Sequence, residues 1–109
     1  MPESFATING IDEARAALAR ERAPTLVSAP GAGATIGPGF WRAMIDTLRD
    51  EYPDMKIRAI LDCGASPGAA MAALRSGIDQ IVFTGHKDAA AKLKAMAETN
   101  GAVLHRRRP

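Results

Sequence analysis

Short apolar runs alternate along the chain with longer segments of helical periodicity. The runs are bounded by turn residues and have no polar alternation, which predicts four buried strands. These strands span about 25–28, 57–61, 81–83 and 102–104. The segments between them repeat their apolar residues every three to four positions, which predicts helices. These helices span about 11–22, 40–52, 67–76 and 87–99.

The order of these elements predicts the fold class. Helical connections between short apolar strands are typical of a parallel sheet covered by helices, so we expect one α/β domain over residues 1–109 with a short basic tail at 105–109. Two arrangements remain open. One is a three-layer sheet of the flavodoxin or Rossmann kind, and the other is a curved sheet with sequential strand order, like half of a (βα)8 barrel. The choice depends on whether helices cover one face or both, which periodicity does not decide.

The helix expected at 67–76 differs from the others in its surface. It is built almost entirely from small and apolar residues, and Ser66 followed by Pro67 gives it a strong start signal. A helix with so few polar positions is expected to be covered on more than one side.

Composition places the chain among ordinary globular proteins. Hydrophobic residues make up 47% of the 109 positions and charged residues 24%, which excludes disorder along the whole length. Aromatic residues are only 5%, so we expect a core packed from small side chains. No apolar run approaches a membrane span, the first ten residues lack the pattern of a signal peptide, and the single Cys63 suits a reducing compartment. We therefore expect a cytoplasmic protein.

The charge distribution argues against a nucleic-acid partner. The net charge is +2, and Arg106, Arg107 and Arg108 account for the whole excess. A nucleic-acid-binding face spreads basic and aromatic residues over a surface, whereas here they form a short run that we expect to be solvated. Alanine-rich helices and the two edges of an open sheet favour packing against another subunit, so we expect a homo-oligomer.

The carboxyl ends of the predicted strands carry the candidate ligand-binding residues. Ligands of parallel α/β proteins bind at this edge, and three loops rich in Gly, Ser and Thr converge there. The first of these loops, at 30–39, contains four glycines and two prolines, which excludes regular structure. Exposed backbone N–H groups can bind phosphate. The candidate anion-binding residues are Gly31, Gly33, Gly37, Gly64, Ser66 and Gly85.

Three side chains at the same edge are candidate catalytic groups. Asp62 ends a strand beside a helix start and is a candidate general base. Cys63 is a candidate nucleophile, and His86 is a candidate base or anion ligand. No zinc-ligand spacing is present, so no metal site is expected, and no particular cofactor is indicated. Whether the protein is an enzyme stays open.

A partial family resemblance involves the same region. Residues 60–64 (ILDCG), 73–78 (ALRSGI) and 81–83 (IVF) resemble one strand-helix-strand unit of the class II fructose-bisphosphate aldolases. The resemblance implies that Asp62 matches the catalytic acid/base and that Cys63 stands where the family has a zinc-binding histidine. Ile60 replaces the family's other nearby histidine. The match covers residues 57–86 and implies a barrel-like arrangement more than aldol chemistry. The whole chain is also similar to small bacterial α/β proteins.

Three functions are consistent with this pattern. The first is binding of a small anionic or phosphorylated ligand at the carboxyl ends of the strands. The second is a non-catalytic oligomerisation or protein-interaction module. The third is a nucleotide-binding Rossmann-like domain, for which Asp62 follows a glycine loop but Gly31 and Gly33 lack the GxGxxG spacing.

Overall fold

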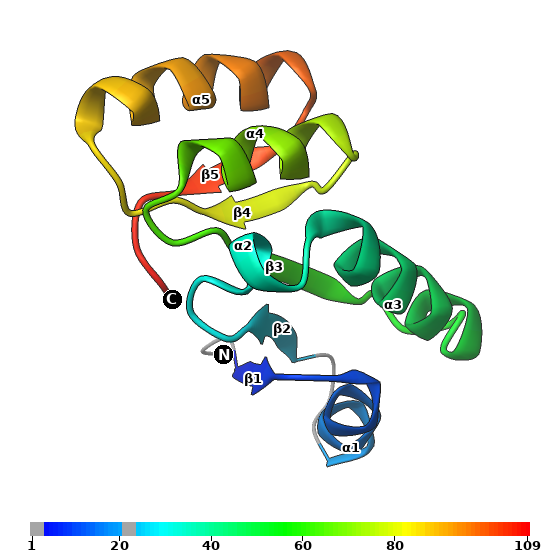
Figure 1. Cartoon of the computed structure of the whole chain (residues 1–109). Helices are drawn as coiled ribbons and strands as arrows, with labels where there is room; N and C mark the ends of the chain where they lie inside the picture. The colour runs from blue at the N-terminus through cyan, green and yellow to red at the C-terminus, as the bar shows by residue number, and fades with distance from the viewer. Residues whose placement is uncertain (1–3, 21–23) are drawn as a thin grey trace.

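The computed structural model describes residues 4–20 and 24–109 and shows a five-stranded parallel sheet with five helices in these residues (Figure 1). The strands are β1 (Phe5–Ile8), β2 (Thr25–Ser28), β3 (Arg58–Asp62), β4 (Gln80–Val82) and β5 (Val103–His105). The helices are α1 (Ile11–Arg20), α2 (Ala32–Thr35), α3 (Pro38–Glu51), α4 (Pro67–Arg75) and α5 (Lys87–Thr99). The α/β class and the parallel sheet are thus confirmed.

The strand order decides between the two predicted arrangements. The strands follow one another as β1-β2-β3-β4-β5, and each neighbouring pair is parallel. Parallel connections are right-handed, so sequential order places every crossover helix on the same face. The helices accordingly lie along one side of the sheet (Figure 1). This is the half-barrel arrangement rather than the three-layer sheet.

The first strand corrects the predicted element order, which began with a helix and had four strands. β1 pairs with β2 from Phe5 opposite Thr25 to Ile8 opposite Ser28. Ile8 is its only buried residue, because β1 is an edge strand with neighbours on one side only. A strand with so little burial has no apolar run for sequence reasoning to find.

Several predicted boundaries also change. The segment 30–39, expected to be irregular, contains the single-turn helix α2 between Gly31 and Gly37, which both have positive φ. Helix α3 begins at Pro38, because proline is favoured in the first helical turn. The helix predicted over 11–22 is observed as α1 to Arg20, and positions 21 and 22 lie outside the described residues.

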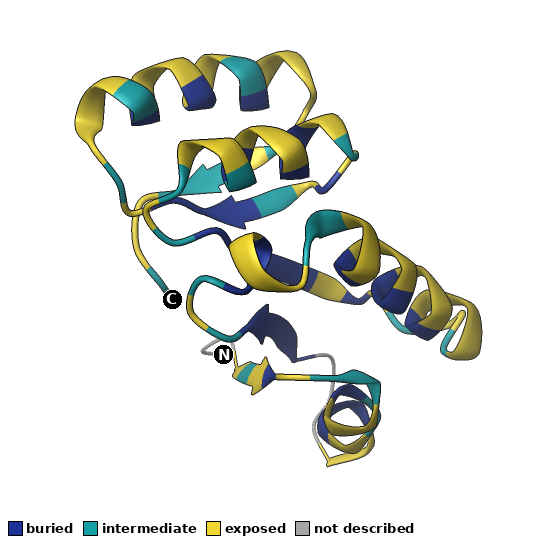
Figure 2. Cartoon of the chain, viewed as in Figure 1, coloured by how far each residue is buried: buried dark blue, intermediate teal, exposed yellow. Residues whose placement is uncertain are grey.

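The core between sheet and helices combines buried alanines with a larger number of Leu, Ile and other large side chains, so it is not built chiefly from small residues as the composition predicts. Buried alanines line the inner side of the helices, and Trp41 and Phe83 are the large buried aromatics (Figure 2). Ala70, Ala73 and Leu74 are the buried positions of α4, whereas Met71 and Ala72 are exposed. Covering of α4 on more than one side, expected from its composition, is seen in the contacts of α4 with α2, α3, α5 and β4, and only its outer positions stay exposed.

The opposite face of the sheet carries a second, smaller apolar cluster. Val27, Ile60 and Val82 are buried there and are separate from the helix-side core. Alternation along the strands places Thr25 and Arg58 on this same face. A hollow of about 370 Å³ lies over it, lined by Phe5, Thr25, Arg58, Ile60, Gln80, His105 and Pro109.

Candidate functional site

The three loops predicted to converge do lie together at the carboxyl ends of the strands. The Gly31 N–H donates to the Asp62 carboxylate at 3.1 Å, and the Thr84 N–H donates to the Gly64 carbonyl at 2.8 Å. A Cβ placed on Gly33 would lie 2.9 Å from the Cys63 sulfur, so glycine is needed for this close approach. We call this edge, with the loops and strand ends that form it, the carboxyl-end rim.

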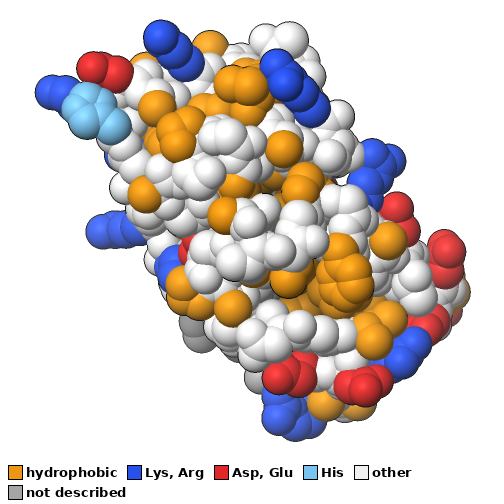
Figure 3. All heavy atoms as spheres, viewed as in Figure 1, with side chains coloured by type: hydrophobic (Ala, Val, Ile, Leu, Met, Phe, Trp, Pro, Cys, Tyr) orange, Lys and Arg blue, Asp and Glu red, His pale blue; other side chains and the backbone are white. Residues whose placement is uncertain are grey.

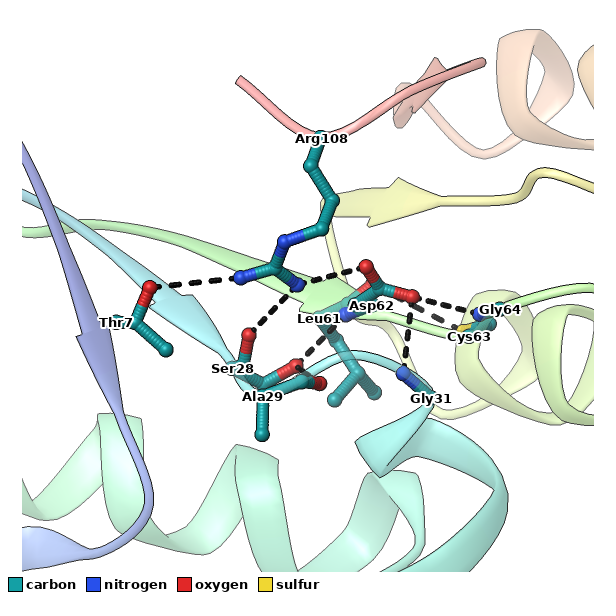
Figure 4. A network of polar contacts seen from close by, with 9 residues as sticks. All are labelled: Thr7, Ser28, Ala29, Gly31, Leu61, Asp62, Cys63, Gly64 and Arg108. Atoms are coloured by element: carbon teal, nitrogen blue, oxygen red, sulfur yellow. Dashed lines mark hydrogen bonds and ion pairs between the residues drawn. The ribbon is translucent and has the colours of Figure 1, made fainter.

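Asp62 is the centre of the rim and is 2% exposed (Figure 4). Its Oδ1 accepts hydrogen bonds from Gly31 N at 3.1 Å and from Gly64 N at 2.7 Å. Gly64 has φ 58°, a conformation that glycine adopts without strain and that turns this N–H toward the carboxylate. Two of the N–H groups predicted to bind an external anion therefore donate to the protein's own carboxylate.

The second carboxylate oxygen is held by the basic tail. Arg108 Nη1 donates to Asp62 Oδ2 at 2.7 Å and to the Ser28 carbonyl at 3.0 Å. Its Nη2 donates to the hydroxyl of Thr7 at 3.4 Å (Figure 4). The expectation of a solvated tail is thus wrong for Arg108, whose side chain is 30% exposed.

Arg106 binds a second position on the rim. Its Nη1 donates to the Phe83 carbonyl and its Nη2 to the Gly85 carbonyl, both at 2.8 Å. The guanidinium carbon also lies 5.6 Å from the centre of the Phe83 ring, which adds a cation–π contact. Arg107, between the two bound arginines, is exposed. Sequence reasoning missed both contacts, because a run of arginines carries no local signal of a partner far away in the chain.

The groups that the rim presents to the tail are hydrogen-bond acceptors. They are the Asp62 carboxylate, the Thr7 hydroxyl and the carbonyls of Ser28, Phe83 and Gly85. A group of acceptors in which one, the carboxylate, carries a negative charge is suited to a cationic donor. The rim as it stands therefore has the chemistry of a guanidinium site.

Cys63 lies on the helix side of β3 and is fully buried in the main core. Burial, together with the smaller effect of the negative charge of Asp62, raises the pKa of its thiol to about 12. A thiol with this pKa is protonated near neutral pH, whereas a cysteine nucleophile reacts as its thiolate. The geometry does not support a nucleophilic role for Cys63.

His86 and Ser66 are both used as helix caps. His86 Nδ1 accepts from Asp88 N at 3.1 Å at the start of α5, and its side chain is 70% exposed. Ser66 Oγ accepts from Ala69 N at 3.1 Å at the start of α4. A cap satisfies one of the free N–H groups of the first helical turn. These contacts explain both residues without a ligand.

Two further candidate glycines have structural roles. A Cβ on Gly85 would lie 2.4 Å from the Phe83 ring, so this glycine lets the β4–α5 loop pass close to that ring. Gly37 has φ 83° and precedes α3, where the chain turns between two helices. Close packing therefore requires glycine at Gly33 and Gly85, whereas at Gly31 and Gly37 it is the positive φ that favours glycine.

Metal sites, membrane-spanning helices and similarity to known proteins were also considered for the residues that the structure describes. Between residues 4–20 and 24–109, no three His, Cys, Asp or Glu side chains lie together in a group that could hold a metal ion. Within the same ranges, no helix has both the length and the apolar character needed to cross a membrane. No protein-family model matches the sequence, and comparisons with curated proteins and with solved structures found no match.

Proposed function

We propose that this protein is a non-catalytic interaction module that associates with a second copy of itself through the outer surface of its helix layer. The observation that carries the proposal is the exposure of large apolar side chains on that surface. Ile36 after α2 is 42% exposed, Phe40 in the first turn of α3 is 60% exposed, and Met71 on α4 is 37% exposed. The three helices are neighbours, because α2 and α3 both pack against α4.

The distribution of charge supports a protein partner at this surface. Figure 3 shows hydrophobic and uncharged atoms over the middle of the helix side and charged side chains around its margin. An apolar centre with a polar rim is the usual anatomy of a protein interface. Gly68, Met71 and Ala72 are exposed on α4, and their small or flexible side chains allow a second helix to approach closely. Covering by a second copy also accounts for the apolar composition of α4.

The state of the candidate catalytic groups favours a module over an enzyme. A general base needs an oxygen that can reach a substrate proton, and both Asp62 oxygens are engaged by Gly31, Gly64 and Arg108. Cys63 is buried as a thiol, and His86 caps a helix. The aldolase-like role of Asp62 as an acid/base would require Arg108 to leave.

Light scattering on the wild-type chain over a range of concentrations tests the proposal. We expect a dimer that dissociates on dilution and that Phe40→Asp converts to a monomer, because a buried charge opposes an apolar interface. Phe5→Asp is the matched control, since Phe5 is an exposed aromatic on the edge strand β1, away from the helix layer, and should leave the dimer intact. A wild-type chain that is monomeric at every concentration contradicts the proposal.

A small anionic ligand at the rim is the second candidate, and Arg108 is the observation that favours it. The bond from Arg108 Nη2 to Thr7 is long at 3.4 Å, so a phosphate oxygen can replace the hydroxyl there. Inorganic phosphate, sugar phosphates or nucleotides should then raise the melting temperature. A ligand at a hundredfold excess over Kd adds about 2.7 kcal/mol to the free energy of unfolding. Arg108→Ala should abolish the shift and Arg107→Ala should keep it. The absence of a shift with all of these ligands contradicts this candidate.

A further inference from the structure

We propose that the carboxyl-end rim is a receptor for arginine side chains, which binds an extended Arg-X-Arg segment through two separate guanidinium sites. In this structure the segment is the chain's own residues 106–108. The rim lies at the strand ends, whereas the proposed self-association uses the outer helix surface. The two proposals therefore stand or fall independently.

The first guanidinium site is formed by the loops at the ends of β2 and β3. Gly31 and Gly64 donate to Asp62 Oδ1 and thereby hold the carboxylate plane with Oδ2 facing the tail. The Ser28 carbonyl lies beside it, and both oxygens accept from Arg108 Nη1. A nearly buried carboxylate fixed by two backbone N–H groups is a strong, pre-oriented acceptor.

The second guanidinium site is complementary to the forked shape of the arginine side chain. The carbonyls of Phe83 and Gly85 each accept from a different terminal nitrogen of Arg106, and the guanidinium carbon lies over the Phe83 ring. Only glycine fits at position 85, because a Cβ would collide with that ring. Lysine has a single ammonium group and cannot donate to both carbonyls with this planar fork.

The way in which the tail is held makes it replaceable. The ladder between β4 and β5 reaches the bond from Phe83 N to the His105 carbonyl at 2.9 Å, and beyond His105 the two guanidinium groups hold the chain to the rim. The tail can leave without breaking the sheet. Arg107 lies between the two bound arginines and is exposed, so the middle residue of the Arg-X-Arg segment can be any residue.

Peptide binding to a full-length chain with an emptied rim tests the proposal. The chain carries Arg106→Ala and Arg108→Ala, and the probe is the synthetic peptide His-Arg-Arg-Arg-Pro, which copies residues 105–109. We expect saturable binding by calorimetry, with shifts of the Gly31 and Gly64 amide resonances in NMR spectra. The same peptide with Arg107→Ala should bind equally well. With Arg108→Ala it should bind about 10- to 100-fold more weakly, which is the usual effect of losing hydrogen bonds to a charged group.

Two results would overturn the proposal. One is no binding of the parent peptide, and the other is equal weakening by Arg107→Ala and Arg108→Ala, which would show attraction by charge alone. If the double variant does not fold, a chain with Arg106→Lys and Arg108→Lys replaces it, because this chain keeps the charge over Asp62 without the fork. Failure of the peptide to displace the lysines of a folded chain of this kind at millimolar excess would equally reject the proposal.

Discussion

The two faces of the sheet are built by the same strands but are buried in different ways. Leu61 points into a large core beneath the helices, whereas its neighbour Ile60 points to the other face and packs with Val27 and Val82 only as a small cluster. Both side chains are nearly inaccessible to solvent. The difference is therefore in the amount of structure packed over each face rather than in exposure.

This asymmetry follows from the strand order and separates stability from recognition. Sequential right-handed crossovers place the helices on one face, and the other face carries a hollow whose lining includes Phe5, Arg58 and Pro109. The helix side supplies most of the buried apolar area, from which most of the stability derives. The rim at the strand ends supplies the polar contacts that can be exchanged for those of a partner.

The largest effect is expected from truncating adjacent residues on the two faces. Leu61→Ala should lower the free energy of unfolding by about 4–5 kcal/mol, since the cavity forms inside a tightly packed core. Ile60→Ala should cost about 2–3 kcal/mol, because the thinner cover can collapse into the space. Urea denaturation of both variants measures the difference. Equal losses would show that the two faces are packed equally well.

Cys63 tests how well the helix side excludes solvent. Its pKa is raised from 9.0 to about 12, so at pH 8 the thiolate fraction is about a thousandfold below that of an ordinary cysteine. Iodoacetamide should therefore modify the native protein at least about a thousandfold more slowly than the urea-unfolded protein. Rapid modification of the native chain would show that the core opens frequently.

The same shift of the Cys63 pKa gives a pH dependence. Between pH 9 and about 12 the thiol is ionised in the unfolded chain and protonated in the folded one, so unfolding releases a proton. Stability should fall as the pH rises through this window, by about 1.4 kcal/mol per unit. Cys63→Ala lacks the group and provides the control, because its stability should change less over the same pH range.

The apolar pattern was sufficient to predict the buried parts of the fold. β2 and β3 were predicted because every residue of β2, and every residue of β3 after Arg58, is buried. β1 was missed because an edge strand with one buried residue has no such run. The convergence of the loops followed from parallel topology, which brings all carboxyl ends of the strands to one edge.

The roles of the rim residues could not be predicted in the same way. Arg108 bonds to Ser28 across 80 positions of the chain and to Thr7 across 101. Contacts of this range leave no periodicity or local motif. The glycine loops predict an external anion at the rim, which stays a prediction, and the sequence could not show that Gly31 and Gly64 donate to the carboxylate of Asp62.

Replacing single arginines of the tail is expected to have an intermediate effect. Arg108→Ala removes a partner from the nearly buried Asp62 carboxylate and should cost about 1.5–3 kcal/mol of stability. Arg107→Ala changes the same residue type one position away, on an exposed side chain, and should stay within about 0.5 kcal/mol of wild type. Thermal unfolding of the two variants compares them directly. If both behave alike, Arg108 does not bind the rim in solution.

The smallest effect is expected at an ion pair on the outside of the helix layer. Arg15 on α1 donates to both carboxylate oxygens of Glu51 on α3, at 2.9 and 2.7 Å, and this hydrogen bonding lowers the pKa of Glu51. A lowered pKa stabilises the fold above the carboxylate's ordinary pKa and loses this effect as the pH falls through the folded value. Glu51→Gln should thus be slightly less stable than wild type at pH 7 and equal to it in strongly acidic solution.

High salt should weaken this exposed pair and leave the nearly buried pair of Asp62 and Arg108 almost unchanged, because only the exposed pair is well screened. Equal salt sensitivity in thermal unfolding of Glu51→Gln and Arg108→Ala would contradict the contrast between the outer helix surface and the rim.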